Sequence, residues 1–104
     1  MPNLGLQGWS LSRDADRDLQ AIAAYSLRNW GRARAEFYIA DIHRRLNLAL
    51  HRNELWTDQS DIRPGTWSLD CGRHRLFFEL RQHNLLVLRV LHQQMDHQRH
   101  LKGN

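Results

Sequence analysis

The last quarter of the chain holds the densest group of side chains that could do chemistry or bind a partner. An apolar run, Leu85–Leu91, is broken only by Arg89, and a polar tail at 93–104 follows it. A short run rich in Leu and Val predicts a strand covered on both faces. Where such a strand passes directly into polar residues, we expect the core to end and a working surface to begin. The residues of that surface are His92, Gln93, Gln94, Asp96, Arg99 and His100.

Three histidines in this segment, His92, His97 and His100, raise the question of a metal site. Zinc sites combine histidine with cysteine or carboxylates, but here no cysteine accompanies them and Asp96 is the only nearby carboxylate. Surface or hydrogen-bonded histidines are the better interpretation. The sequence also lacks a glycine-rich phosphate loop and a cysteine pair. We therefore expect no metal, nucleotide or other cofactor.

Arginines form a second group with chemical potential. The last two predicted strands carry Arg73, Arg75, Arg81 and Arg89, and by alternation the first three share one face. A charge on a central strand is costly to bury without a partner. Arg89 is therefore expected to pair with a carboxylate, to face a groove or to meet a binding partner, and the salt bridge is favoured.

The length and the charge distribution limit the domain number and the class of partner that we expect. A chain of 104 residues predicts one domain, 1–104. Residues 1–60 carry eight basic and seven acidic groups, a net charge of +1, whereas residues 61–104 carry seven and four, a net charge of +3. The electropositive second half favours an acidic partner, such as nucleic acid, a nucleic-acid enzyme complex or an acidic protein segment. The alternative is a solvated surface rich in arginine.

Several features favour the cytoplasm. The sequence has no apolar run of about 18 residues that could span a membrane. Its N-terminus lacks a basic region followed by an apolar one, so we expect no secretory signal. The single cysteine, Cys71, has no partner for an internal disulfide, which fits a reducing compartment. Its simplest role is that of a small hydrophobe facing a core.

The first half of the chain predicts a strand and two helices. The strand is placed at 6–11, and Ser12 is a good N-cap for a helix with acidic residues in its first turn. Gly31 suits the end of that helix. A second helix with an apolar stripe then runs through 35–50. The single glycine between them makes the helices an antiparallel hairpin that must pack on something else.

The second half predicts strands in hairpin succession. The stretch 53–65 is irregular, and Pro64–Gly65 suits a type II turn. Strands follow at Trp67–Cys71, 75–81 and Leu85–Leu91, with a tight reversal at Gly72. The order is an N-terminal strand, a two-helix hairpin, a three-stranded antiparallel sheet and a short C-terminal tail. This is an α+β fold.

The motifs of the second half resemble the ParE toxins of bacterial type II toxin–antitoxin systems. That family typically ends in RVLHQRMDxxRHL, and residues 89–101 depart from this pattern chiefly at Gln94, where arginine is common. The helices fit the family as well, although many sequences share their stripe. The motifs that carry the resemblance are Ile62-Arg63-Pro64-Gly65, Gly72-Arg73-His74, Phe77-Phe78, Val90-Leu91-His92-Gln93-Gln94-Met95-Asp96 and Arg99-His100-Leu101.

The resemblance implies a RelE-like fold, a ParD-like antitoxin as partner, and growth inhibition through DNA gyrase without catalysis by the toxin. For the antitoxin we expect apolar anchors and arginines to form the contact surface. For gyrase we expect contact through the tail residues His92, Gln93, Gln94, Asp96, Arg99 and His100. The expected antitoxin contacts are Trp9, Trp30, Arg73, Arg75, Arg81 and Arg89, and the other two tryptophans, Trp56 and Trp67, are further candidates.

Two alternatives remain beside gyrase inhibition. RelE relatives cleave mRNA on the ribosome, which requires groups that activate a 2′-hydroxyl and stabilise the phosphorane. The only lysine is Lys102, the tyrosines lie in the helices, and Phe78 stands where ParE relatives often have tyrosine. Arg73, Arg89 and His92 would be the catalytic residues of such a nuclease. The other alternative is a non-toxic relative that only binds an antitoxin.

Overall fold

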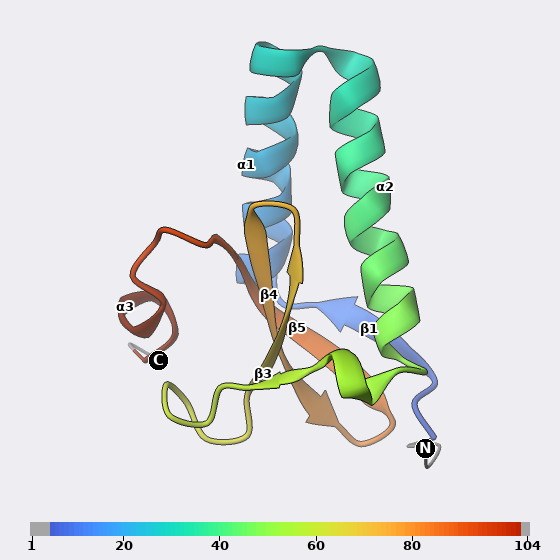
Figure 1. Ribbon diagram of the computed structural model, residues 1–104, viewed down its shortest axis with the longest axis vertical. Helices are drawn as coiled ribbons and strands as arrows, with labels where there is room; N and C mark the ends of the chain where they lie inside the picture. The colour runs from blue at the N-terminus through green and yellow to red at the C-terminus, as the bar shows by residue number, and fades with distance from the viewer. Residues whose placement is uncertain (1–4, 103–104) are drawn as a thin grey trace.

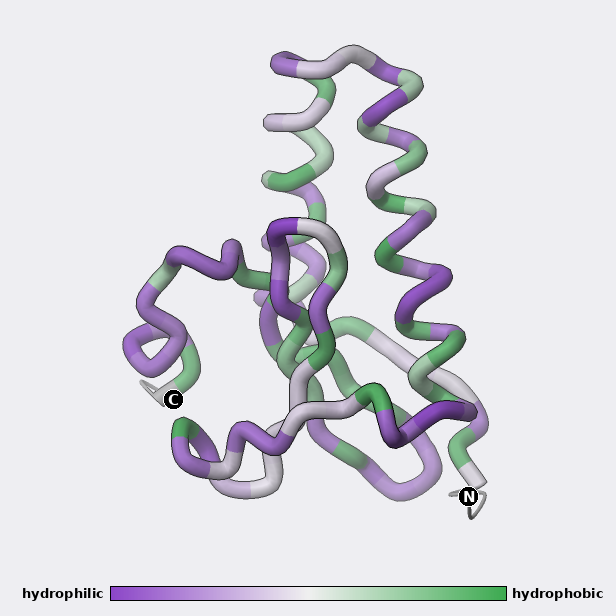
Figure 2. Tube along the Cα trace, in the orientation of Figure 1, coloured by the Kyte–Doolittle hydropathy of each residue, from purple (hydrophilic) through white to green (hydrophobic). Residues whose placement is uncertain are grey.

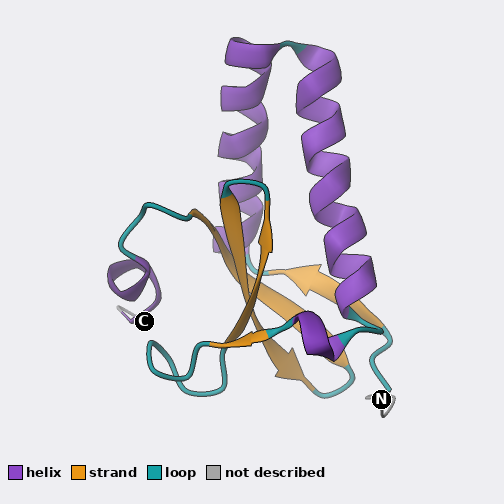
Figure 3. Cartoon of the chain, in the orientation of Figure 1, coloured by secondary structure: helices purple, strands orange, loops and turns teal. Residues whose placement is uncertain are grey.

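The computed structural model describes residues 5–102, so the predicted tail and domain extend slightly beyond the described residues. A two-helix hairpin stands on one face of a twisted sheet, and a short helix lies to the side of it (Figure 1, Figure 3). The elements are β1 Gly8–Leu11, α1 Arg13–Trp30, α2 Arg32–Ala49, the 3₁₀ helix η1 Asn53–Leu55, β2 Thr57–Asp58, β3 Trp67–Cys71, β4 His74–Arg81, β5 Asn84–His92 and α3 His97–Lys102.

The α+β class and the order of the main elements are confirmed, and the sheet is larger than predicted. Its strand order is β1-β5-β4-β3-β2. The antiparallel series β3, β4 and β5 is present as expected. The N-terminal strand is shorter than 6–11 and pairs with β5 in parallel. The predicted irregular stretch contains β2, two residues that pair antiparallel with β3.

The first helix begins and ends where the sequence indicates, and the second spans Arg32–Ala49, so it begins earlier than the predicted 35–50. The Ser12 Oγ accepts a 3.0 Å hydrogen bond from the backbone N–H of Ala15, and Gly31 closes α1 with a φ of 89°. Each helix turns small or apolar side chains inward, which gives the alternating hydropathy along the hairpin in Figure 2. Within residues 5–102 no helix is both long and apolar enough to cross a membrane.

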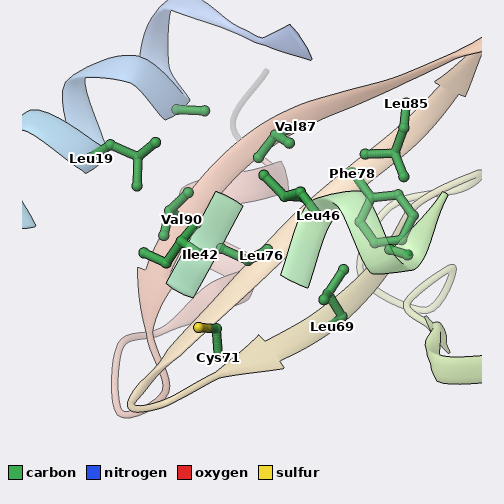
Figure 4. Close-up of a cluster of buried hydrophobic side chains, with 12 residues drawn as sticks. Leu19, Ile42, Leu46, Leu69, Cys71, Leu76, Phe78, Leu85, Val87 and Val90 are labelled. Carbon is green, nitrogen blue, oxygen red and sulfur yellow. The ribbon is translucent and has the colours of Figure 1, made fainter. Parts of the chain in front are cut away.

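Apolar side chains cover both faces of the sheet. The larger cluster lies between the hairpin and the sheet (Figure 4) and includes Leu19, Ile42, Leu46, Leu69, Cys71, Leu76, Phe78, Leu85, Val87 and Val90. A smaller cluster joins Phe77, Leu91 and Leu101, with Ile62 against it. Because Phe77 and Phe78 are consecutive in one strand, these clusters lie on opposite faces. The prediction that the last strand is covered on both faces is confirmed.

A β-bulge changes the direction of side chains along β5. Phe78 pairs with Val87 and Phe77 pairs with Arg89, so Leu88 is an extra residue without its own partner on β4. After the bulge, Val90 faces the hairpin and Leu91 faces the smaller cluster. Arg89 consequently lies on the face away from the hairpin, at the margin of the sheet.

The start of α1 forms hydrogen bonds with the part of the β5 edge that β1 does not pair with. The pairing with β1 ends at Val87. Beyond it, the Ser12 backbone N–H donates to the Val87 carbonyl at 2.9 Å, and the Ser12 hydroxyl donates to the Leu88 carbonyl at 2.8 Å. The Val90 N–H then donates to Asp18 Oδ2 at 2.8 Å. These three backbone groups, on the part of the β5 edge that β1 does not cover, therefore have hydrogen-bond partners in α1 and its N-cap.

Gly72 leaves the space that the Tyr38 ring occupies. A Cβ at Gly72 would lie 2.7 Å from Tyr38 Cε1, and the backbone φ is +58°. We expect Gly72→Ala to lower the free energy of unfolding by about 2 kcal/mol or more, because both the conformation and the contact oppose a side chain. Gly65→Ala is the matched control, since Gly65 has a φ of +76° but open space around it. Urea denaturation of both variants checks this, and equal losses would contradict the role of the Tyr38 contact.

Candidate partner-binding site

The polar tail is fixed to the end of the sheet at its first residues. The Gln93 backbone N–H donates to the Arg73 carbonyl at 2.9 Å, and its side-chain amide donates to the Gly72 carbonyl at 3.3 Å. The Gln94 N–H donates to His92 Nδ1 at 3.1 Å. These bonds turn the chain away from the direction of β5. The tail is therefore held in one conformation where it leaves the core.

The rest of the tail folds back on the sheet as α3. Leu101 is buried in the smaller cluster. The His97 ring packs edge-on against Phe77 with centroids 5.1 Å apart, and its Nε2 bonds to the His92 carbonyl at 3.0 Å. Asp96 accepts from the Arg99 N–H at 3.2 Å and so caps the helix. Of the two apolar tail residues, Leu101 packs back while Met95 is exposed.

The predicted target-binding residues share this one segment and differ in exposure. Four of them are exposed, namely Gln93, Gln94, Asp96 and Arg99. The other two, His92 and His100, are half-buried. Because α3 is anchored through Leu101 and His97, its polar side chains have a stable support. The arrangement can present amides, one carboxylate and one guanidinium to a macromolecular surface.

Arg89 is paired with a carboxylate, which is the favoured one of its three expected environments. Its Nε and Nη2 donate to the two oxygens of Asp18 at 2.8 and 3.0 Å, and the two side chains are only 20% and 15% exposed. The hydrogen bonds to Asp18 raise the pKa of the Arg89 guanidinium. The pair ties α1 to β5, so little of Arg89 is open to a partner.

The other strand arginines are spread over two places. Arg75 pairs with Asp70 at 2.7 Å and Arg81 pairs with Glu79 at 2.7 Å, on the face of β4 away from the hairpin. The prediction that Arg73 lies on a strand and shares this face is wrong, because Arg73 belongs to the two-residue turn between β3 and β4. Its side chain is exposed there, and its carbonyl receives Gln93. Arg73 is thus a neighbour of the tail.

The four tryptophans fall into three environments. Trp56 and Trp67 pack against the main cluster and each other. Trp9 also packs against the main cluster, but it lies beside α2, where its Nε1 donates to Asn47 Oδ1 at 2.8 Å. Trp30 is 55% exposed at the tip of the hairpin, with the Arg34 guanidinium over its ring. Trp30 is therefore the tryptophan most open to a partner.

A chain of rings that sequence reasoning missed joins α2 to the base of the tail. The Tyr38 hydroxyl donates to the Cys71 carbonyl at 3.0 Å and lies 2.6 Å from His74 Nδ1, and the His74 and His92 rings meet edge-on at 5.5 Å. Burial, followed by the neighbouring His92, lowers the pKa of His74. Burial raises the pKa of Tyr38. No direct signal of this contact lies in the sequence, because His74 comes to pair with His92 only through the bulge in β5.

Cys71 behaves as the small hydrophobe that was predicted. It lies in the main cluster, and its Sγ donates to Asp41 Oδ2 at 3.4 Å. Burial, together with that bond, raises the pKa of the thiol to about 11. A thiol with so high a pKa is protonated at neutral pH and is a poor nucleophile.

Of the three residues expected of a nuclease, Arg89 lies apart from Arg73 and His92. Arg89 lies on one face of β5 and is bonded to Asp18. His92 lies on the other face, beside His74, and Arg73 is on the turn. In the described part of the chain, His, Cys, Asp and Glu side chains also form no group of three or more that could hold a metal ion.

Comparisons with known proteins agree with this arrangement. Residues 10–97 match the family model of the ParE toxin of the type II toxin-antitoxin system parDE. A Toxin ParE1 of Mycobacterium tuberculosis (strain CDC 1551 / Oshkosh) is 33% identical over 92 residues, which are 88% of this chain and 94% of that protein. The Toxin ParE of Escherichia coli is 28% identical over 88% of this chain and 89% of its own length.

Two solved structures share the fold. The chromosomal ParDE TA system from P. aeruginosa matches with a TM-score of 0.71 and 18% identity, covering 85% of this chain and 97% of that one. The toxin-antitoxin complex RelBE2 from Mycobacterium tuberculosis matches with a TM-score of 0.52 and 23% identity, covering 83% and 96%. The RelE-like fold is thereby confirmed. With the family model matched over most of its length, the chain belongs to the ParE toxins of type II toxin–antitoxin systems.

Proposed function

We propose that this ParE-family protein inhibits DNA gyrase and that a ParD-like antitoxin neutralises it in the cytoplasm. The observation that carries the proposal is the polar tail, which is anchored on the sheet and exposes Gln93, Gln94, Asp96 and Arg99. A fixed polar surface of this kind loses little entropy when it binds. In this proposal the protein acts as one domain and binds its target stoichiometrically, without catalysis.

The antitoxin half of the proposal draws on the charge and the exposed aromatic surface. The net charge is +4, and an acidic, disordered segment that folds on binding would be complementary to it. Trp30, Arg73 and Arg81 are exposed and are the first candidates for its contacts. Trp9 and Arg75 offer part of their surface, whereas Arg89 is largely taken by Asp18. The solved relatives named above as ParDE and RelBE2 are toxin–antitoxin systems, which supports a partner of this kind.

RNA cleavage receives less support. A general base, a phosphate-binding cation and an acid must lie within hydrogen-bond reach of one substrate position. Arg73, Arg89 and His92 are divided between a turn and the two faces of β5. A nuclease would need these groups to be rearranged on the ribosome.

The decisive experiment compares the two targets directly. Purified protein is added to gyrase with relaxed plasmid and ATP, and in parallel to a translating extract with a reporter mRNA. We expect loss of supercoiling with accumulation of cleaved DNA, and intact mRNA. Codon-phased mRNA cuts with normal supercoiling would overturn the proposal in favour of a nuclease. A folded, antitoxin-binding protein that is silent in both assays would also overturn it and indicate a non-toxic relative.

A further inference from the structure

One flank of α2 carries four residues that are at least partly open to solvent and belong to neither core cluster, although Asp41 accepts from the buried Cys71 thiol. They are Phe37, Asp41, Arg44 and Leu48, separated by four, three and four positions. Phe37 is 59% exposed and Leu48 is 39% exposed, while the side chains of Asp41 and Arg44 are 42% and 57% exposed. Alternating steps of three and four are the spacing of the seam between two paired helices. The inward stripe of α2, with Ile42 and Leu46, is separate from this flank.

The four side chains are already arranged as one strip. The Arg44 guanidinium lies over the Phe37 ring at 5.3 Å from the centroid, and its Nη2 donates to Asp41 Oδ1 at 3.1 Å. The upper part of the hairpin extends past the sheet (Figure 1), and the strip follows it along the part of α2 whose Tyr38 and Ile42 pack against the sheet. From residue 37 to residue 48 it is about 16 Å long.

The strip is complementary to a second copy of itself. When two α2 helices lie antiparallel around a two-fold axis between residues 42 and 43, Phe37 of each copy faces Leu48 of the other. Asp41 of each copy then faces Arg44 of the other. Two apolar layers flank two layers of opposite charge, and this pattern satisfies the rule of an isologous interface. A surface shaped for an unrelated protein has no need of this symmetry.

We propose that two copies of this chain associate through the α2 strip formed by Phe37, Asp41, Arg44 and Leu48. Four side chains from each copy make a small interface, and the net charge of +4 on each copy opposes association. The dimer is therefore weak and forms at high protein concentration. The inference is independent of the gyrase proposal, because it uses only the geometry of α2.

Charge exchange provides a sharp test. Sedimentation velocity is recorded from about 1 µM to about 1 mM protein, the range in which a weak dimer dissociates. Asp41→Arg places arginine against arginine, and Arg44→Asp places aspartate against aspartate, so each variant is expected to be monomeric throughout. Mixed together, the two variants restore both opposite-charge layers and should form a heterodimer. The double variant Asp41→Arg/Arg44→Asp should form a homodimer again.

Arg17→Asp is the matched control, since Arg17 is an exposed helical arginine on α1. It should dimerise like the wild type. Circular dichroism establishes that every variant is folded, because Asp41 also accepts from Cys71. A wild-type protein that is monomeric at about 1 mM overturns the proposal. So does dimerisation that neither single charge reversal weakens, since the copies would then meet through another surface.

Discussion

Deletion of residues 93–104 is expected to abolish growth inhibition and to leave antitoxin binding largely intact. The reason is that the tail holds the exposed polar residues proposed to meet gyrase, whereas the exposed antitoxin candidates lie outside the deleted segment, with only Arg73 adjoining it. Colony counts after induction measure the first effect, and co-purification with the antitoxin measures the second. A truncated protein that remains fully toxic would contradict the role of the tail.

The deletion also has a structural consequence that must be separated from the functional one. It removes Leu101 from the smaller cluster and uncovers Phe77 and Leu91. Leu101→Ala alone removes the same packing contact and is expected to lower the free energy of unfolding by about 2–4 kcal/mol, while it keeps the polar surface. The sharper variant is Gln94→Ala/Arg99→Glu, which alters two exposed side chains and leaves the anchor in place. Loss of toxicity in this double variant, with unchanged thermal unfolding, would assign the effect to the polar surface.

Asp18→Ala is expected to give the largest loss of stability among substitutions of a charged residue, about 2–4 kcal/mol. The Asp18 carboxylate receives two bonds from Arg89 and one from the Val90 N–H, and it is 15% exposed. Without it, a largely buried guanidinium and a backbone donor at the edge of β5 lose their partner. The midpoint and slope of urea denaturation measure the change.

Asp16→Ala is the control, because Asp16 lies two residues earlier on an exposed part of α1. The free energy of unfolding of this variant should stay within about 0.5 kcal/mol of the wild-type value. The double variant Asp18→Ala/Arg89→Met should recover part of the loss, since it removes the buried charge together with its partner. Equal stability of the Asp18 and Asp16 variants would show that the ion pair contributes nothing.

The local features of the fold could be predicted because their signals lie within a few residues. Ser12 and Gly31 mark the ends of α1, and each is confirmed by its own backbone geometry. The apolar run at Leu85–Leu91 indicated a strand with two covered faces, and the two clusters bear this out. In the same way, the cost of burying Arg89 predicted a carboxylate partner before that partner was known.

The features that were missed depend on pairing over long distances. Asp18 lies 71 residues from Arg89, and the sequence around either residue does not indicate that the two will pair. The parallel pairing of β1 with β5 was missed for the same reason, since the two strands lie far apart in the sequence. β2 is two polar residues without alternation. The bulge at Leu88 breaks the strict alternation on which the assignment of faces relied, although its position inside the run of apolar residues left no visible mark.

Because β5 lies between β1 and β4, the sheet cannot form fully until β5 has been synthesised. β1, α1 and α2 leave the ribosome first, yet the strand that pairs with β1 and carries Asp18's partners is the last of the five to be made. Contacts of such long sequence separation form slowly. The nascent chain therefore passes through a stage in which the apolar stripes of its hairpin are uncovered, and a chaperone or a partner can meet it before the finished fold exists.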